Sequence, residues 1–265
     1  MDPETSAVPV AERPSERHEP LHLRYFALLR SNVNFRCERH QQQPIEAGAP
    51  AKEPAAKSPL REGWNYFRAN PKITVLVLAK TGQGCVGGVL LLLAVFGERI
   101  FPIAGQGALA MGLLYSARGT GAGVGPLVGD ILTRGTESRM WKSISLSFLV
   151  MGTAYIAFGQ APTLVLAALA VFFGHMGASN IWVTSTALLQ LNSEDRFRGR
   201  VFAVDFGMNM LAAAASNFVL GLGLDSWGLS ARQLASSFGL VLLIPGLFWL
   251  PAQAKWGRRI DRFSD

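Results

Sequence analysis

Apolar residues are sparse in the first sixty positions of the chain and dominate the remainder. From residue 61 onward they form six runs, most of them close to the roughly 20 residues that a helix needs to cross a hydrocarbon core of about 30 Å. The runs cover residues 73–96, 107–132, 141–158, 162–191, 201–224 and 234–251. This pattern predicts an all-α membrane protein with six transmembrane helices.

The polar start of the chain is predicted to be a separate region, 1–60, ahead of a six-span domain, 61–265. Residues 1–20 hold four prolines and no apolar run, so we expect disorder and no cleavable signal peptide. Residues 21–35 are amphipathic but too short and too charged to cross, which favours a place at the membrane interface. Residues 38–59 have the composition of a linker, and 61–72 predict a second interfacial helix.

Basic residues are distributed unevenly around the runs. The segment 191–203 is expected to be a short loop containing Arg196, Arg198, Gly199 and Arg200. Short loops rich in Lys and Arg stay in the cytoplasm. Six spans place on that same side Arg61, Arg68, Lys72, Arg134, Arg139, Lys142, Lys255, Arg258, Arg259 and Arg262, and on the other side only Arg99 and Arg232. Both ends of the six-span region are therefore predicted to be cytoplasmic.

The composition agrees with a membrane protein, since 49% of the 265 residues are hydrophobic and 16% are charged. A net charge of +7 would suggest nucleic-acid binding in a soluble domain, but here the basic residues flank apolar runs and are better explained as topology determinants. Cys37 and Cys85 form no disulfide or metal pattern. With no nucleophile–base pair, metal cluster or phosphate loop, we expect no enzyme activity, no catalytic residue, no metal and no cofactor.

The second run is rich in glycine, at positions 119, 121, 123, 125 and 129. A Gly-x-Gly spacing also occurs in nucleotide loops, but no strand precedes it here. Glycines three or four residues apart let another helix approach closely in lipid. We therefore predict helix packing at Gly84, Gly88, Gly121, Gly125 and Gly129.

Three ionisable residues fall well inside the runs, namely Lys80, Arg118 and His175, and Asp205 lies nearer the cytoplasmic end of its run. A charge in hydrocarbon costs at least about 2.5–3.5 kcal/mol, so each is a candidate for a cavity or an internal ion pair. Lys80 has an equal alternative, because its long side chain can snorkel to the cytoplasmic interface. For Arg118 we expect an internal partner, and Asp205 is the carboxylate named for it.

Two of the runs carry polar stripes at helical spacing. His175, Ser179, Trp182 and Thr186 fall on one face of the fourth, and Asp205, Asn209 and Ser216 on one face of the fifth. Such stripes either line a substrate cavity or form hydrogen bonds that hold the bundle together. The sequence leaves both interpretations open.

Three segments together resemble the C-terminal half of major facilitator superfamily transporters, in the bacterial drug and siderophore exporter-like branch. They are Glu-Gly-Trp-Asn-Tyr-Phe-Arg-Ala-Asn-Pro from Glu62, the glycine-rich segment around Arg118, and Arg-Gly-Arg-Val-Phe-Ala-Val-Asp at 198–205. The resemblance implies two six-helix halves around a central cavity, with alternating access driven by a proton gradient. Residues 23–36 also resemble the lead-in to the family's first helix, but the first six spans are missing.

The sequence and the resemblance thus predict a half or truncated efflux-type secondary carrier for a small organic molecule, in a bacterial inner membrane. We expect the carrier to be proton-coupled. Its expected partners are the lipid bilayer, the substrate, and a second copy or a separate N-terminal half, but no nucleic acid. The alternative hypothesis is a non-transporting fragment or a helix-packing scaffold.

Overall fold

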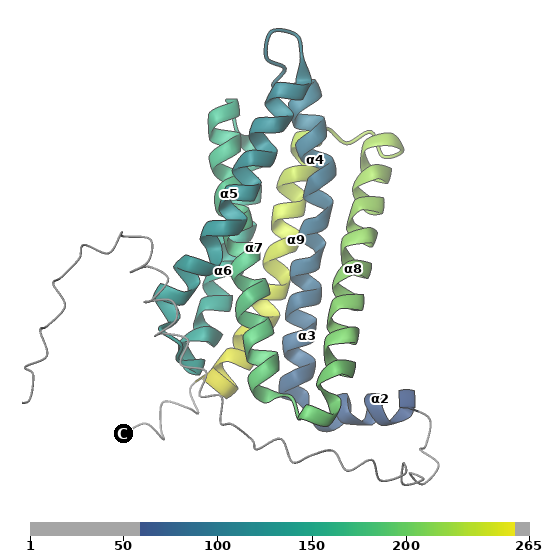
Figure 1. Ribbon diagram of the computed structural model, residues 1–265. Helices are drawn as coiled ribbons and strands as arrows, with labels where there is room; N and C mark the ends of the chain where they lie inside the picture. The colour runs from purple at the N-terminus through teal and green to yellow at the C-terminus, as the bar shows by residue number, and fades with distance from the viewer. Residues whose placement is uncertain (1–58, 258–265) are drawn as a thin grey trace, which may run out of the picture. The chain divides into compact units, whose positions relative to one another are not determined.

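The computed structural model describes residues 59–257 (Figure 1). In this range the regular structure is helical, apart from one bridge between Ile103 and Gln106 that closes a turn. The predictions made for residues 1–58, including disorder, the amphipathic segment 21–35 and the linker, lie outside the described residues, as do the basic positions beyond residue 257.

The helices follow one another with short connections. They are α2 (Pro59–Ala69), α3 (Pro71–Gly84), the 3-10 turn η1 (Cys85–Gly88), α4 (Val89–Val95), the π turn η2 (Phe96–Ile100), α5 (Gly107–Thr133), α6 (Glu137–Gln160), α7 (Leu164–Asn192), α8 (Asp195–Asp225), α9 (Ala231–Ala252) and the π turn η3 (Gln253–Gly257).

Local sequence explains where several of these helices begin and end. Pro71 opens α3, where its missing N–H costs nothing. Ser230 and Gln233 form a capping box at the start of α9. The Ser230 hydroxyl accepts the backbone N–H of Gln233, and Gln233 Oε1 accepts the backbone N–H of Ser230. At the end of α5, Arg134 and Gly135 both have positive φ, which turns the chain toward α6.

Each of the six apolar runs is helical, and five helical segments are long and apolar enough to cross a membrane. These are Pro71–Ile100, Glu137–Gln160, Leu164–Asn192, Asp195–Asp225 and Ala231–Gly257. The helix α5 has the length, with 27 residues, but its seven glycines and Arg118 make it less apolar. A membrane-crossing role for α5, and with it the count of six spans, stays a prediction.

The long helices run side by side, with α7 packed against α5, α6 and α3, and with α8 packed against α3 (Figure 1). Large aromatic side chains fill the contacts. The rings of Trp141 and Trp249 stack with centroids 4.6 Å apart, and those of Phe96 and Phe158 stack at 4.1 Å. Such pairs join α6 to α9 and to the end of the first long segment.

The basic segment 191–203 is not the loop that the sequence predicted. Helix α7 ends at Asn192 and α8 begins at Asp195, so Arg196, Arg198, Gly199 and Arg200 lie in the first turns of α8. Arginine is a good helix former, and Asp195 favours a helix start because its charge opposes the positive N-terminal end of the helix dipole. Asp195 also pairs with Arg198 at 2.5 Å.

Helix α2 lies at the end of the bundle where α3 and α8 begin (Figure 1). The two oxygens of the Glu62 carboxylate accept hydrogen bonds from Arg196 at 2.8 Å and Arg200 at 2.9 Å. The Tyr66 ring stacks on Phe197 at 4.3 Å, and its hydroxyl accepts the N–H of Glu194. An ion pair and an aromatic stack thus attach α2 to α8.

We expect Glu62→Gln to loosen α2, seen as faster amide hydrogen exchange across Pro59–Ala69. The hydrogen bond from Arg200 is the main reason why the pKa of Glu62 lies below its usual value, and the charge of Arg196 adds to it. Since this pKa is lowered, the contribution of Glu62 is present above the ordinary carboxylate range and disappears as the pH falls through the lowered value. The exposed Glu98, in η2, provides the control variant Glu98→Gln. Exchange in α2 that is the same in both variants would contradict the role of the pair.

Candidate functional site

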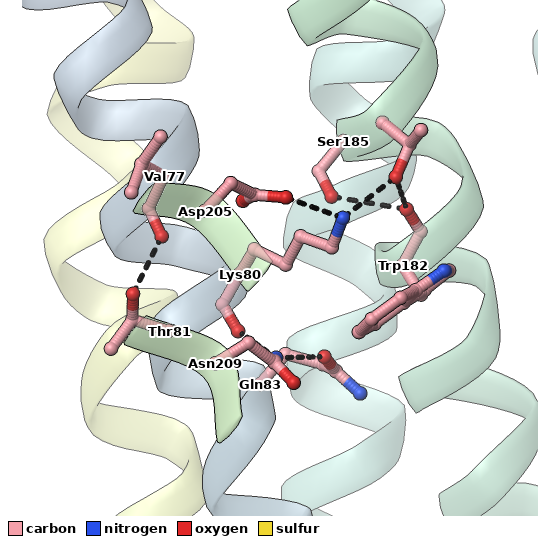
Figure 2. Close-up of polar contacts among 9 residues, drawn as sticks. Val77, Lys80, Thr81, Gln83, Trp182, Ser185, Asp205 and Asn209 are labelled. Carbon is pink, nitrogen blue, oxygen red and sulfur yellow. Dashed lines mark hydrogen bonds and ion pairs between the residues drawn. The ribbon is translucent and has the colours of Figure 1, made fainter. Parts of the chain in front are cut away.

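A buried ion pair joins α3 to α8. The ammonium of Lys80 lies 2.7 Å from Oδ2 of Asp205, and the two residues are only 3% and 1% exposed (Figure 2). Lys80 also donates to Thr186 Oγ1 at 2.8 Å and lies 4.1 Å from the centre of the Trp182 ring. A carboxylate, a hydroxyl and an aromatic face together replace the water that the ammonium loses on burial. The snorkelling alternative for Lys80 is therefore excluded.

The other oxygen of Asp205 has a different environment. Oδ1 is buried and has no hydrogen-bond partner in the described part of the chain. A buried acceptor without a partner is costly, so its presence in a native structure calls for an explanation. Asn209, one turn further along α8, donates instead to the Lys80 carbonyl at 2.8 Å and to Gln83 Oε1 at 3.1 Å (Figure 2). Asn209 holds α8 against α3 and leaves Asp205 Oδ1 open to one more hydrogen.

The predicted pairing of Arg118 with Asp205 is wrong. Asp205 is paired with Lys80, whereas Arg118 Nε donates to Nε2 of His175 at 2.8 Å. The partner of Arg118 therefore lies on the neighbouring helix α7 and not on α8. Helix α5 packs closely on α7, which brings Arg118 and His175 together and leaves α8 next to α3.

The contact with Arg118 determines the tautomer of His175. Arginine is always protonated, so Nε2 of the imidazole must accept and the ring is neutral with its proton on Nδ1. Nδ1 is in short hydrogen-bond contact with the hydroxyl of Tyr155, on α6. The imidazole and the phenol are both buried. Arg118, His175 and Tyr155 thus form a chain of polar groups across α5, α7 and α6.

The polar stripe of α7 connects the two clusters. His175 contacts Arg118, Trp182 and Thr186 contact Lys80, and Ser179 lies between them on the same face. Ser179, Trp182 and Thr186 are only partly buried, as is Arg118. The second stripe, with Asp205, Asn209 and Ser216, is buried on α8. The stripes therefore make interhelical hydrogen bonds, and the α7 stripe is also partly open.

The five glycines proposed for packing lie where helices touch. A Cβ added at Gly121, Gly125 or Gly129 would overlap atoms of α7, at Phe172, Met176 with Ser179, and Asn180 respectively. Gly84 and Gly88 meet α8 in the same way, at Asn209 and at Leu220 with Ser216. Gly112, Gly119 and Gly123 behave differently, because a Cβ added there has no neighbour within 4 Å.

This difference predicts unequal effects of adding one methyl group. Gly121→Ala and Gly125→Ala should destabilise the detergent-solubilised protein by about 1–3 kcal/mol, because the clash is with backbone carbonyls that cannot move aside. Gly119→Ala and Gly123→Ala, on the open face of the same helix, are matched controls and should be neutral or slightly stabilising. Chemical unfolding followed by tryptophan fluorescence measures both pairs. Equal effects in the two pairs would show that α5 does not pack on α7 through this face.

Sequence reasoning missed two polar groups. Tyr155 lies in the apolar run 141–158, and nothing nearby in sequence marks it as a partner of His175. Asn180 donates to Ser143 and Ser147, each at 2.7 Å, and accepts from Thr184 at 3.1 Å. Its spacing of five residues from His175 placed it off the predicted stripe. This second network joins α6 to α7 and is fully buried.

In the described part of the chain, two apolar pockets lie outside these clusters. One, of about 310 Å³, lies between α3 and α9 and includes Val75, Gly82 and Phe248. The other, of about 600 Å³, lies between α6 and α7 and includes Val150, Leu166 and Phe173. Neither lining includes Lys80, Arg118, His175 or Asp205, so we do not assign the polar site to them. In residues 59–257, no three His, Cys, Asp or Glu side chains are grouped as metal ligands.

Comparisons with known proteins identify the family. Neither the curated proteins nor the solved structures contain a match to this chain. The family model described as Major Facilitator Superfamily matches residues 23–217, which is well over half of the sequence. With its apolar helices and this match, the chain is an integral, multi-pass membrane protein and a member of the Major Facilitator Superfamily of transporters.

Proposed function

We propose that the chain is one half of a proton-coupled secondary transporter that exports a small organic molecule, with Asp205 as its proton-binding residue. The observation that carries the proposal is the buried Lys80–Asp205 pair, whose second carboxylate oxygen has no partner in the described residues. Ionisable pairs inside a membrane domain are expensive and are typical of ion pathways and proton relays.

The pair offers a direct route from protonation to movement. A proton arriving at Asp205 Oδ1 neutralises the carboxylate and leaves the Lys80 ammonium buried without a counter-ion. A single buried charge is strongly unfavourable, so the protonated state favours any arrangement in which Lys80 reaches water. The two arrangements then differ in proton affinity, and proton binding shifts the equilibrium between them.

The open faces of α7 and α8 support an assembly of two halves. The α7 stripe is partly open at Ser179, Trp182 and Thr186, and the apolar stretch of α8 is only 17% buried. A second six-helix half, either another copy or a separate N-terminal half, would cover these faces and enclose a cavity between the halves. We further propose that both ends of the domain face the cytoplasm of a bacterium, as the basic starts of α3, α6 and α8 favour.

Gradient-driven transport tests the proposal. Vesicles containing the purified protein are loaded with radiolabelled organic acids, bases and neutral compounds, and a pH difference is imposed across the membrane. We expect the pH difference to drive movement of at least one compound through the wild-type protein. Asp205→Asn should abolish the response to the gradient while downhill exchange continues, because the site then binds no proton.

The exposed Asp225, at the far end of α8, supplies the matched control Asp225→Asn, which should retain the response. Gradient-driven movement that persists in Asp205→Asn would contradict the assignment of Asp205.

A scaffold without transport activity is the second candidate. It is favoured by Gly112, Gly119 and Gly123 on one face of α5, where an added Cβ would have no neighbour within 4 Å in the described chain, because such an open small-residue face suits a partner helix. The vesicle assay, run with several copies in each vesicle and repeated with the separate half present, distinguishes the two functions, because a scaffold moves none of the compounds in either case.

A further inference from the structure

The polar clusters of this domain contain one positive charge more than negative charges. Lys80 and Asp205 neutralise each other. Arg118 has no ion-pair partner in the described residues, and its one hydrogen bond is to His175, which is neutral. The nearest acidic residue along α5 is Asp130, twelve residues away, or roughly 18 Å along a helix. The Arg118 charge is therefore uncompensated by the described chain.

The guanidinium of Arg118 is held in place by a chain of hydrogen bonds. Its Nε is fixed by His175, and His175 is fixed in turn by the hydroxyl of Tyr155. The terminal nitrogens Nη1 and Nη2 make no hydrogen bond in the described chain, and the side chain is partly exposed. Two parallel N–H groups at the end of a fixed guanidinium match the two oxygens of a carboxylate.

The surroundings favour an anion over a cation or a neutral molecule. Arg118 and the Lys80 cluster lie on the same face of α7, where His175 and Trp182 are seven residues or about 10 Å apart. The charge sits in a segment where it costs several kcal/mol unless a counter-charge is present. A negative ligand group relieves this cost, whereas a positive one would increase it.

We propose that the transported substrate is a small organic anion and that its carboxylate, or a chemically similar group, binds Nη1 and Nη2 of Arg118. This inference rests on the proposed transport function and specifies its substrate class. A single carboxylate balances the single unpaired charge. His175 and Tyr155 are positioning residues, since they hold Arg118 and do not reach its free nitrogens.

Ligand-dependent stability tests the site without requiring transport. The purified protein is heated in detergent with sodium benzoate, with benzyl alcohol as the neutral analogue, with benzylammonium chloride as the cation, or with sodium chloride at equal ionic strength. A ligand that binds the folded state raises the unfolding temperature with saturation. We expect benzoate alone to do so.

Substitutions of Arg118 test whether benzoate binds at this residue. Arg118→Gln should weaken benzoate binding about tenfold or more, as expected for loss of a charged hydrogen-bonding partner. Arg118→Lys keeps the charge without the paired N–H groups and should bind with intermediate affinity. Arg99→Gln removes an exposed arginine in η2 and is the matched control, with binding unchanged.

Equal stabilisation by benzoate and benzyl alcohol, unchanged benzoate binding in Arg118→Gln, or no saturable response to benzoate in the wild-type protein would each overturn the proposal. The wild-type comparison of the three ligands stands even if Arg118→Gln does not fold. Benzoate binding without gradient-driven transport would refute the transport function and leave the anion site intact. Transport of cations or neutral compounds without benzoate binding would refute the anion site and leave the transport function intact.

Discussion

Replacing either member of the Lys80–Asp205 pair is expected to destabilise the domain by about 3–5 kcal/mol. Asp205→Leu leaves an ammonium buried at 3% exposure with only Thr186 and the Trp182 ring as partners. Lys80→Met leaves a buried carboxylate with no cation. The double variant Lys80→Met/Asp205→Leu removes both charges and should recover most of the loss, because well-packed apolar side chains can replace a buried ion pair at little cost. Unfolding in mixed detergent micelles gives the three free energies.

A second double-mutant cycle, between Arg118 and Asp205, provides the control for the cycle between Lys80 and Asp205. Arg118→Gln and Asp205→Asn affect residues with different partners, His175 and Lys80, so their effects should add within about 0.5 kcal/mol. Additivity in the Lys80–Asp205 cycle, or strong coupling between Arg118 and Asp205, would mean that the pairing described here does not exist in the membrane domain.

A single copy of this 265-residue polypeptide is expected to transport nothing. The α7 stripe is partly open, and only 17% of the apolar stretch of α8 is buried. In lipid, a partly open polar face on α7 is unfavourable, and a cavity with only one wall cannot alternate its access. On the proposed half-transporter function, we expect transport to require a second copy or a separate half, and we expect dilution to one copy to abolish it.

The positions of the helices could be predicted from the sequence because apolar length is a strong signal. The run 73–96 lies within the segment Pro71–Ile100, and the run 234–251 lies within α9. The secondary structure of the basic segment 191–203 was harder to predict. Charge predicts which residues avoid hydrocarbon, but it does not prevent them from continuing a helix, and Arg196, Arg198 and Arg200 do so at the start of α8.

Pairing inside the bundle could not be predicted, since it depends on which helices are neighbours. The polar faces of α7 and α8 follow from helical spacing, but Lys80 and Asp205 are 125 residues apart and meet only because α3 packs on α8. Arg118 reaches His175 because α5 packs on α7. Tyr155 completes that chain from α6, whose charged residues lie in its first two turns and far from Tyr155.

The glycines of α5 also show what helical spacing can predict and what it cannot. Spacing by four places Gly121, Gly125 and Gly129 on one face, and Gly119 and Gly123 on another. Spacing alone does not say which face meets a helix of the same chain. In the structure the first face packs on α7 and the second remains open, which leaves room for a partner.

Transport by single vesicles with counted copies tests the central claim most directly. The protein carries one fluorophore, photobleaching steps count the copies in each vesicle, and movement of a labelled organic anion is recorded in the same vesicle under a pH difference. We predict saturable, gradient-dependent movement in vesicles that hold two copies, or one copy with its separate half, and none in vesicles with one copy. Saturable transport in vesicles that hold one copy alone would contradict the account.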